Sequence, residues 1–262
     1  MRSECVDFGH AMQGGAWPSP LGGSPGYVRG LMLTQEELSQ LRALIRARWL
    51  AHLLAVCPRE ASRFAERPMA QYHELAHLID HATVWTKAAR LFAPEEVEQI
   101  GAMSVFAALR ERWGAVEIAD IEGLGYPETY WRLVRPNSPE DVAGVHADAW
   151  FYRHTNGLSD TQQAGLVKLW LAVDVEPGVS GLALMPDSHR RAWPYRVEVR
   201  HGRMKPVFDA DPAQLALTRV EACPGEAIVF HPHLLHQGLA HCSTRSRISV
   251  ECAVRVAGGR FA

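Results

Sequence analysis

The chain lacks several features that would place it directly in a class of proteins. None of the apolar runs in its 262 residues reaches the roughly 18 residues that a membrane-spanning helix needs. Its formal net charge is only −2, so it generates no strong field that would attract nucleic acid or an anionic membrane surface. We therefore expect a soluble protein whose partner is a small molecule, and neither nucleic acid nor a membrane.

Cysteine is also scarce. The five cysteines include no C-x-x-C pair, which argues against a disulfide framework and against a zinc knuckle. The first 30 residues hold seven glycines and three prolines but no apolar segment of the kind found in secretion signals. We expect reduced thiols, a cytoplasmic location and a flexible N-terminal arm over residues 1–30.

Helical patterns are present in the first half of the chain. Thr34 and Glu37 form a capping box, and apolar residues then recur at helical spacing until Pro58, which predicts a helix over 35–56. Two further stretches with helical periodicity cover residues 69–91 and 94–114. The first half is therefore predicted to be a layer of helices.

The second half has a different texture. From about residue 130, short runs rich in Val, Leu, Trp and Phe alternate with turn signals such as Glu176-Pro177-Gly178, which is typical of antiparallel strands. We expect a mainly β protein with N-terminal helices packed against an antiparallel sandwich or a jelly roll. In this interpretation a single domain spans 31–262, with a helical layer over 31–128 and the β core over 129–256.

A candidate metal site lies in the segment GVHADAWFYRH. If this segment is a strand, His146 and Asp148 point to the same face, where an imidazole and a carboxylate can chelate a metal ion. The same alternation would place Trp150 and Tyr152 on that side, as an aromatic wall. A third ligand must come from elsewhere, and the candidates in the later histidine-rich segment are His231, His233, His236 and His241.

The order of these motifs resembles a known family. His146-x-Asp148, then His236, then Arg247-x-Ser249 is similar to the pattern of Fe(II)/2-oxoglutarate-dependent oxygenases, and more narrowly of the phytanoyl-CoA dioxygenase family. The segment GLALMPDSHR resembles a second family motif, with Asp187 where the family usually has glycine. The segment CPGEAIVFHPHLLHQG resembles a third motif, with Glu226 in place of the usual aspartate.

The resemblance implies a fold and a set of roles. The fold would be a double-stranded β-helix, the jelly roll of cupin-like proteins, with a jelly-roll core over 129–256 in one oxygenase domain over 31–262. The metal ligands would be His146, Asp148 and His236, holding Fe(II). Arg247 and Ser249 would bind the co-substrate 2-oxoglutarate, and the planar arginine fork suits the far carboxylate of that molecule. The implied reaction uses dioxygen and converts 2-oxoglutarate to succinate and carbon dioxide. It oxidises an unactivated C–H bond of a small metabolite, and hydroxylation is favoured because the related halogenases lack the carboxylate ligand.

Four side chains are expected to line the substrate pocket. Two are the aromatic residues of the metal-site segment, one is a lysine of a later predicted strand, and one is an arginine of the segment YWRLVRPN. They are Trp150, Tyr152, Lys168 and Arg132.

Two other classes of function remain open from the sequence. The segment His73-Glu74-Leu75-Ala76-His77 has the H-E-x-x-H spacing of zinc peptidases, but the position expected for a third histidine holds Thr83. A cupin-like binding protein without turnover is the other alternative, although the intact ligand set and Arg247 disfavour it. Neither the substrate nor the oligomeric state follows from the sequence.

Overall fold

The computed structural model describes residues 21–200 and 202–257, and the first 20 residues of the expected arm lie outside this part. None of the helices in the described part combines the length and the apolar character needed to cross a bilayer. The α-helices have these bounds: α1 Gln35–Val56, α2 Pro58–Ala65, α3 Tyr72–Leu75, α4 His81–Val84, α5 Lys87–Arg90, α6 Pro94–Gly101, α7 Ser104–Trp113, α8 Asp148–His154 and α9 Asp160–Gln163.

The strands form a major sheet, a minor sheet and a hairpin, all antiparallel. The major sheet has the order β1-β9-β4-β11-β2, with β3 also pairing with β11; the minor sheet is β10-β5-β8, and β6 pairs with β7. Their bounds are β1 Tyr27–Met32, β2 Val116–Ile118, β3 Tyr130–Val134, β4 Leu166–Asp174, β5 Leu182–Leu184, β6 Tyr195–Arg200, β7 Arg203–Phe208, β8 Thr218–Arg219, β9 Glu226–Phe230, β10 His236–Gly238 and β11 Arg247–Val256.

The two faces of the major sheet carry different side chains, because successive residues of a strand point to opposite faces. On the outer face, Leu169 of β4 and Val250 of β11 pack with Trp49 of α1 in one apolar cluster. On the inner face, Trp170 of β4 packs with Leu182 of the minor sheet in a second cluster. This arrangement of helices on one face and a second sheet on the other confirms the jelly-roll prediction.

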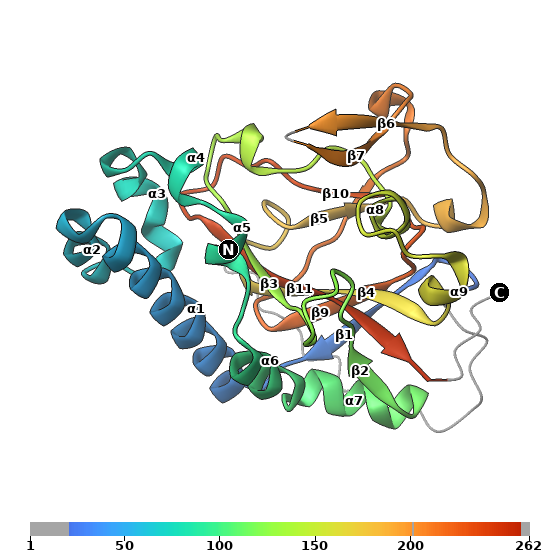
Figure 1. The fold of residues 1–262 in the computed structure, drawn as a ribbon, viewed down its shortest axis with the longest axis horizontal. Helices are drawn as coiled ribbons and strands as arrows, with labels where there is room; N and C mark the ends of the chain where they lie inside the picture. Colours follow the sequence, from blue (N-terminus) through green and yellow to red (C-terminus); the bar gives the residue numbers. More distant parts are fainter. Residues whose placement is uncertain (1–20, 201, 258–262) are drawn as a thin grey trace.

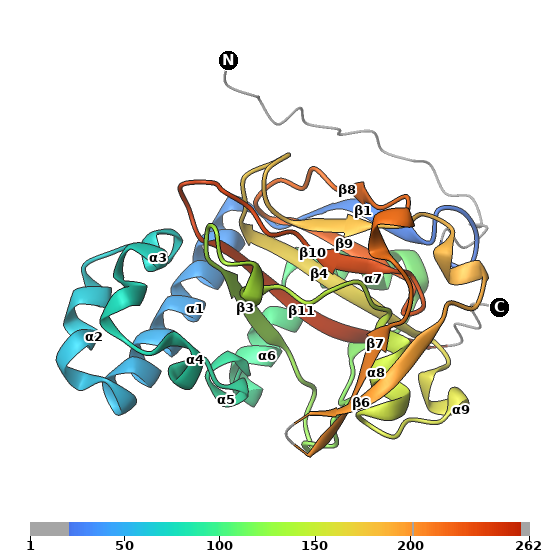
Figure 2. The same ribbon diagram turned by 90° about the horizontal axis from the view of Figure 1, so that it is seen from above.

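Figures 1 and 2 show how this arrangement is spread in space. Helices α1 to α3 lie at one side of the β core, and the β6–β7 hairpin with α8 lies at the other side. The region between the hairpin, α8 and the inner face of the major sheet is where the candidate site is found.

Some predicted boundaries differ from those observed. The helix over 35–56 is confirmed, including its capping box, in which Glu37 N donates to Thr34 Oγ1 and Thr34 N donates to the Glu37 carboxylate. The single helical stretch predicted over 69–91 is instead a series of short helices. Asp80 and Thr86 accept hydrogen bonds from backbone N–H groups three residues ahead, so each starts a new turn.

Two strands also lie outside the expected core range. Strand β1 starts at Tyr27, inside the expected arm, and pairs with β9. Strand β2 lies inside the expected helical layer and pairs with the end of β11. The major sheet is therefore assembled from both halves of the sequence.

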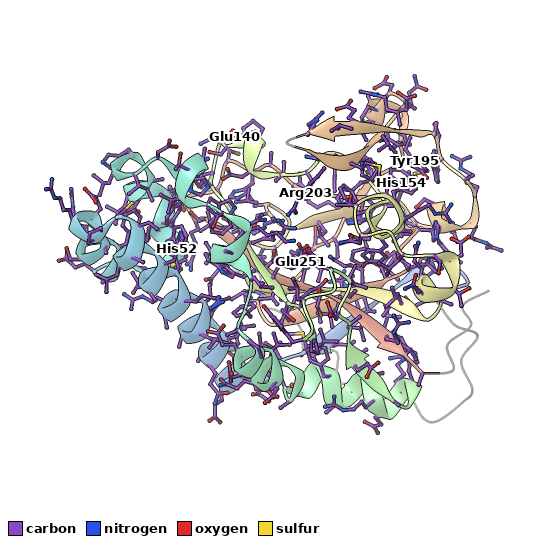
Figure 3. All side chains as sticks on the ribbon, viewed as in Figure 1. His52, Glu140, His154, Tyr195, Arg203 and Glu251 are labelled. Atoms are coloured by element: carbon purple, nitrogen blue, oxygen red, sulfur yellow. The ribbon has the colours of Figure 1, made fainter. Side chains whose placement is uncertain are left out.

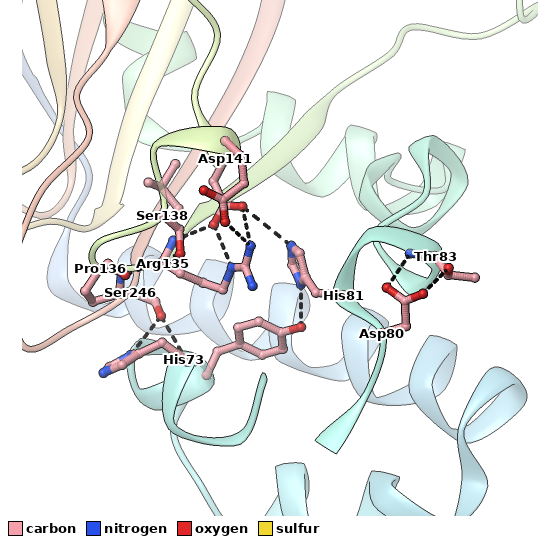
Figure 4. Close-up of polar contacts among 12 residues, drawn as sticks. His73, Asp80, His81, Thr83, Arg135, Pro136, Ser138, Asp141 and Ser246 are labelled. Atoms are coloured by element: carbon pink, nitrogen blue, oxygen red, sulfur yellow. Dashed lines mark hydrogen bonds and ion pairs between the residues drawn. The ribbon is translucent and has the colours of Figure 1, made fainter. Parts of the chain in front are cut away.

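A polar cluster joins the helical layer to the loop that follows β3 (Figure 4). The Arg135 guanidinium makes two hydrogen bonds, of 2.7 and 2.8 Å, to the Asp141 carboxylate. His81 Nε2 lies 4.0 Å from Asp141 Oδ1, and the other ring nitrogen, Nδ1, bonds the Tyr72 hydroxyl at 2.6 Å. Since this loop leads directly to His146, the cluster connects the α3–α4 region to the candidate site.

Protonation of His81 is expected to weaken this cluster. Burial lowers the pKa of His81 to about 4, from an ordinary value of about 6.5. Between these values the unfolded state binds the proton more readily, so stability falls as the pH drops below about 6.5, with about 2 kcal/mol lost at pH 5 from this group. In urea unfolding at pH 7.5 and pH 5, His81→Gln should show a smaller pH dependence than the wild type. An equal dependence in both proteins would contradict the assignment.

Candidate metal centre

The candidate site brings together the side chains of His146, Asp148 and His236. In the sequence, strands β4 to β9 lie between His236 and the other two residues. One ligand atom from each lies within 4.8 Å of the others, and this is the one such group of His, Cys, Asp and Glu found across residues 21–200 and 202–257. His146 and His236 exchange two backbone hydrogen bonds, of 3.0 and 2.9 Å, as an antiparallel bridge. This bridge places the two imidazole rings 4.3 Å apart, measured between their centroids.

The two imidazoles are oriented by the backbone. His146 Nδ1 lies 2.8 Å from Gly144 O, and His236 Nδ1 lies 3.0 Å from Leu234 O. A carbonyl oxygen accepts hydrogen bonds only, so each ring carries its proton on Nδ1 and presents the lone pair of Nε2. Metal-bound histidines usually have their second nitrogen fixed in this way.

The orientation of the Asp148 carboxylate suits a cation bound between it and the two imidazoles. Its Oδ2 atom is buried, has no hydrogen-bond partner among the described residues, and lies 3.5 Å from His236 Nε2. Two lone pairs that face each other repel unless a positive charge lies between them. Burial lowers the pKa of His146 to about 4, with His236 as the next contributor, which keeps the ring neutral and able to donate its lone pair. The three residues therefore fit a divalent metal ion.

The expectation that His146 and Asp148 share a strand is wrong. Asp148 is the first residue of helix α8, which runs to His154. The two side chains still converge, because His146 belongs to the bridge with β10 and the chain turns into α8 immediately afterwards. Ala149 N donates to Pro232 O at 2.9 Å and fixes the start of the helix against the segment before β10.

The helix also changes which aromatic residues face the site. Trp150 is stacked on Tyr195 of the hairpin, with ring centroids 4.5 Å apart, and packs in an apolar cluster with Phe208 and Leu235. It therefore does not form the expected wall beside the metal position. At helical spacing, residues three and four positions after Asp148 share its side, and these are Phe151 and Tyr152.

Both of those residues line a large cavity that contains His146 and Asp148. Its volume is about 740 Å³, and we call it the outer cavity. Phe151 packs edge-on against His146, with ring centroids 5.4 Å apart, and the buried Tyr152 hydroxyl has no hydrogen-bond partner. Tyr152 was among the expected pocket residues and lines this cavity, whereas Phe151 was missed because the segment was interpreted as a strand.

The hairpin and α8 form one side of the outer cavity. Arg203 and Lys205 of β7 line it, as does His154, whose Nε2 bonds the Tyr195 hydroxyl at 2.9 Å. Figure 3 shows His154 and Tyr195 together beside the hairpin, and Glu251 on the sheet near the middle of the molecule. The cavity thus has a wall from the hairpin and helix and a floor from the major sheet.

A smaller cavity of about 130 Å³ lies deeper between the two sheets, and we call it the inner cavity. His146, His236 and Arg247 line it, and its apolar surface comes from Trp170, Leu182 and Phe230. The inner cavity therefore joins the metal position to a buried arginine.

Arg247 has the properties of an anion-binding residue. It is 5% exposed, Nη1 donates to Gly181 O at 2.9 Å, and Nε has no hydrogen-bond partner within the described part of the chain. Among the described residues no ion pair joins it to a carboxylate. Burial lowers its pKa to about 10, so the guanidinium remains charged at neutral pH. The Ser249 hydroxyl, on the same face of β11, is also buried without a partner.

A charged network is shared by the two cavities, with Lys168 and Glu251 largely buried and the Arg132 side chain 41% exposed. Arg132, Lys168 and Glu251 line both cavities. Burial alone would raise the pKa of Glu251, but Arg132 and Lys168 lower it to about 2. Burial alone would lower the pKa of Lys168, but Asp148 and Glu251 raise it above its ordinary value. All three side chains are therefore charged at neutral pH.

The predicted pocket residues Lys168 and Arg132 thus lie at the site, and Glu251 is an addition. Glu251 follows Arg247 by four residues on the same strand, so strict alternation places both on the inner face. That alternation was a usable signal in the sequence.

The H-E-x-x-H segment does not form a metal site in the described structure. His73 and His77 lie in short consecutive helices, and His73 Nδ1 bonds the Ser246 hydroxyl at 3.1 Å. Neither residue belongs to a group with metal-ligand geometry among the described residues. The zinc peptidase alternative is therefore not favoured.

The departure at Asp187 also has a local explanation. Asp187 has a φ of 63°, in the left-handed region that favours glycine, and aspartate is one of the residues that tolerates it. The other departure, Glu226, pairs with Arg29 of β1 at 2.8 Å and so ties the first strand to β9.

Comparison with solved structures gives distant matches over nearly the whole chain. EctD from S. alaskensis, solved with 2-oxoglutarate and 5-hydroxyectoine, is 15% identical with a TM-score of 0.53, and the match covers 91% of this chain and 76% of that one. The non-heme monooxygenase ThoJ is 19% identical with a TM-score of 0.49, covering 92% and 78% of the two chains. At these identities the EctD match supports the fold alone.

The sequence comparisons are more specific about the family. No curated protein gives a significant match to the chain. The profile of the phytanoyl-CoA dioxygenase family, however, matches residues 27–249, a span that contains the minor sheet, the major sheet up to the start of β11, the three metal-site residues and Arg247. The chain belongs to the phytanoyl-CoA dioxygenase family.

Proposed function

We propose that this protein is an Fe(II)/2-oxoglutarate-dependent oxygenase that hydroxylates, or otherwise oxidises, an unactivated C–H bond of a small-molecule metabolite. The observation that carries the proposal is the convergence of two Nε2 lone pairs and an unpartnered carboxylate oxygen beside a cavity that ends in an unpaired arginine. Two histidines and one carboxylate on one face leave other positions of the metal open, as non-haem Fe(II) oxygenases require. When bound, Fe(II) with 2-oxoglutarate and dioxygen supplies the oxidising chemistry and yields succinate and carbon dioxide.

The two cavities would hold different molecules, with 2-oxoglutarate in the inner cavity and the substrate in the outer cavity. Arg247, which lines the inner cavity, and Ser249, on the same face of β11, would bind the far carboxylate of 2-oxoglutarate, and the Trp170, Leu182 and Phe230 side chains would exclude water from its carbon chain. The near end of the molecule would then face His146 and His236. A charge buried in this way binds most favourably when both the guanidinium fork and a hydroxyl donate to it.

The outer cavity would hold the substrate. It opens next to His146 and Asp148, so a bound molecule would lie against the metal position, with Phe151 and Tyr152 on one side. The Tyr152 hydroxyl can donate a hydrogen bond that orients the substrate. Asp148 supports hydroxylation over halogenation, since it occupies the position that a halide would need. The zinc peptidase is the weaker candidate, and the position of His73 against Ser246 does not support it.

The first test is turnover. Anaerobically purified protein given Fe(II), 2-oxoglutarate and air should form succinate, because uncoupled decarboxylation does not require the substrate. His146→Ala and Arg247→Ala should reduce the rate by at least 100-fold, since each removes a group with no substitute nearby. Succinate is measured by chromatography.

Matched controls separate this proposal from its alternatives. His77→Ala and Arg59→Ala remove a histidine and an arginine that are exposed and remote from both cavities, and should retain the wild-type rate. No succinate from the wild type, together with zinc that co-purifies with it but not with His77→Ala, would favour the peptidase motif as the true site. No succinate and no such zinc would favour a binding protein without turnover.

The second test is affinity for 2-oxoglutarate. With Ni(II) in place of Fe(II), so that no turnover occurs, Arg247→Ala should raise the Kd about 100-fold and Ser249→Ala about 10-fold. These changes correspond to the loss of one or two hydrogen bonds to a charged group, at about 1.5–3 kcal/mol each. Arg247→Lys keeps the charge but not the planar fork and should give an intermediate Kd. Titration calorimetry measures all four proteins, and an unchanged Kd in Arg247→Ala would place the anion site elsewhere.

A further inference from the structure

The charged network between the cavities is built by three neighbouring strands. Lys168 comes from β4, Glu251 from the central strand β11, and Arg132 from β3. Strand β11 pairs with β4 on one side and with β3 on the other. Glu251 therefore lies between the two cationic side chains on the inner face of the sheet.

The contacts of the network lead towards the metal centre. Arg132 Nε lies 2.5 Å from Glu251 Oε1. Lys168 Nζ lies 3.6 Å from Glu251 Oε2 and also 3.6 Å from Asp148 Oδ1. The side chains of Lys168, Glu251 and Asp148 are 12%, 15% and 11% exposed, so these charges interact in a poorly hydrated environment where ion pairs are strong.

The two oxygens of Asp148 thus face different partners. Oδ2 lies 3.5 Å from His236 Nε2, on the side where the histidine lone pairs converge, whereas Oδ1 faces the Lys168 ammonium. An isolated carboxylate at the start of a helix can rotate about its χ2 torsion, which is broad for aspartate. A cation fixed on one oxygen restricts that rotation and presents the other oxygen to the metal.

We infer that Lys168 is a positioning residue for Asp148, and that Glu251, itself anchored by Arg132, keeps Lys168 in place. This inference rests on the proposed function only in taking Asp148 as a metal ligand. Groups that hold the first ligands of a metal typically contribute 10- to 100-fold to its affinity.

The sign of the charge effect explains why Glu251 is needed. A lysine ammonium next to a divalent cation repels it, so Lys168 alone would weaken metal binding. Glu251 offsets this positive charge at a distance of 3.6 Å. Removing Lys168 alone would therefore have two opposing effects on metal affinity. Loss of the contact to Asp148 would lower the affinity, and loss of the positive charge would raise it, so a single variant could not separate them.

A charge-matched double variant separates them. Lys168→Met combined with Glu251→Gln removes one positive and one negative charge, so the net charge of the site is unchanged while the contact to Asp148 Oδ1 is lost. Co(II) is titrated anaerobically into the metal-free protein, and its visible ligand-field absorption reports both the affinity and the coordination. The double variant should bind Co(II) at least 10-fold more weakly than the wild type, with an altered absorption spectrum.

Lys168→Arg is the conservative companion, because it keeps a cation within reach of Asp148. It should restore most of the affinity, which a general disruption of the sheet would not allow. Thermal unfolding of the metal-free proteins gives the fold stability independently. Wild-type Co(II) affinity in the double variant, or an equal loss in the double variant and Lys168→Arg, would overturn the inference.

The same titration distinguishes failure of the inference from failure of the proposed site. His146→Ala should lose Co(II) binding if the metal centre is correct. If His146→Ala binds Co(II) as the wild type does, the metal centre itself is wrong. If His146→Ala loses binding while the double variant binds normally, the metal centre stands and the role given to Lys168 is wrong.

Discussion

Two backbone hydrogen bonds between His146 and His236 are the constraint on which the site depends. They join a loop that follows β3 to the first residue of β10, ninety positions later in the chain, and they fix the two imidazoles side by side. These hydrogen bonds use only backbone N–H and C=O groups, so both imidazole side chains remain available to bind a metal ion. The contacts of the rings to Gly144 and Leu234 then orient the remaining nitrogens toward Asp148.

The major sheet resolves a second problem, which is how to hold charges inside a folded core. Its outer face is fully apolar against the helices, and this burial supplies most of the hydrophobic stabilisation. Its inner face changes along β4 from Trp170, which packs against the minor sheet, to Lys168 beside the metal position. A buried charge is costly unless it is paired, and here Glu251 lies between two cations, so each charge has a partner.

The residues of the candidate site can be predicted from the sequence better than the secondary structure that carries them. Order and spacing made His146, Asp148, His236 and Arg247 candidates. The structure brings the first three together and places Arg247 in the same inner cavity as the two histidines. Alternation along β11 would also have made Glu251 a candidate. The error was local: the segment after His146 alternates like a strand, but tertiary contacts such as Ala149 N to Pro232 O start a helix there. Periodicity in so short a segment fits both structures, and the choice is made by contacts that lie far away in the sequence.

The placement of Asp148 at the first position of α8 has a broader consequence. His146, His236 and Arg247 are held by strand pairing, and Asp148 is fixed where α8 begins, whereas the walls of the outer cavity come from later residues of α8 and from the β6–β7 hairpin. Phe151 and Arg203 therefore lie outside the major and minor sheets, which carry His236 and Arg247. The molecule is modular in this respect: substitutions in the hairpin and in α8 beyond Asp148 can reshape the outer cavity while the candidate metal centre is left intact.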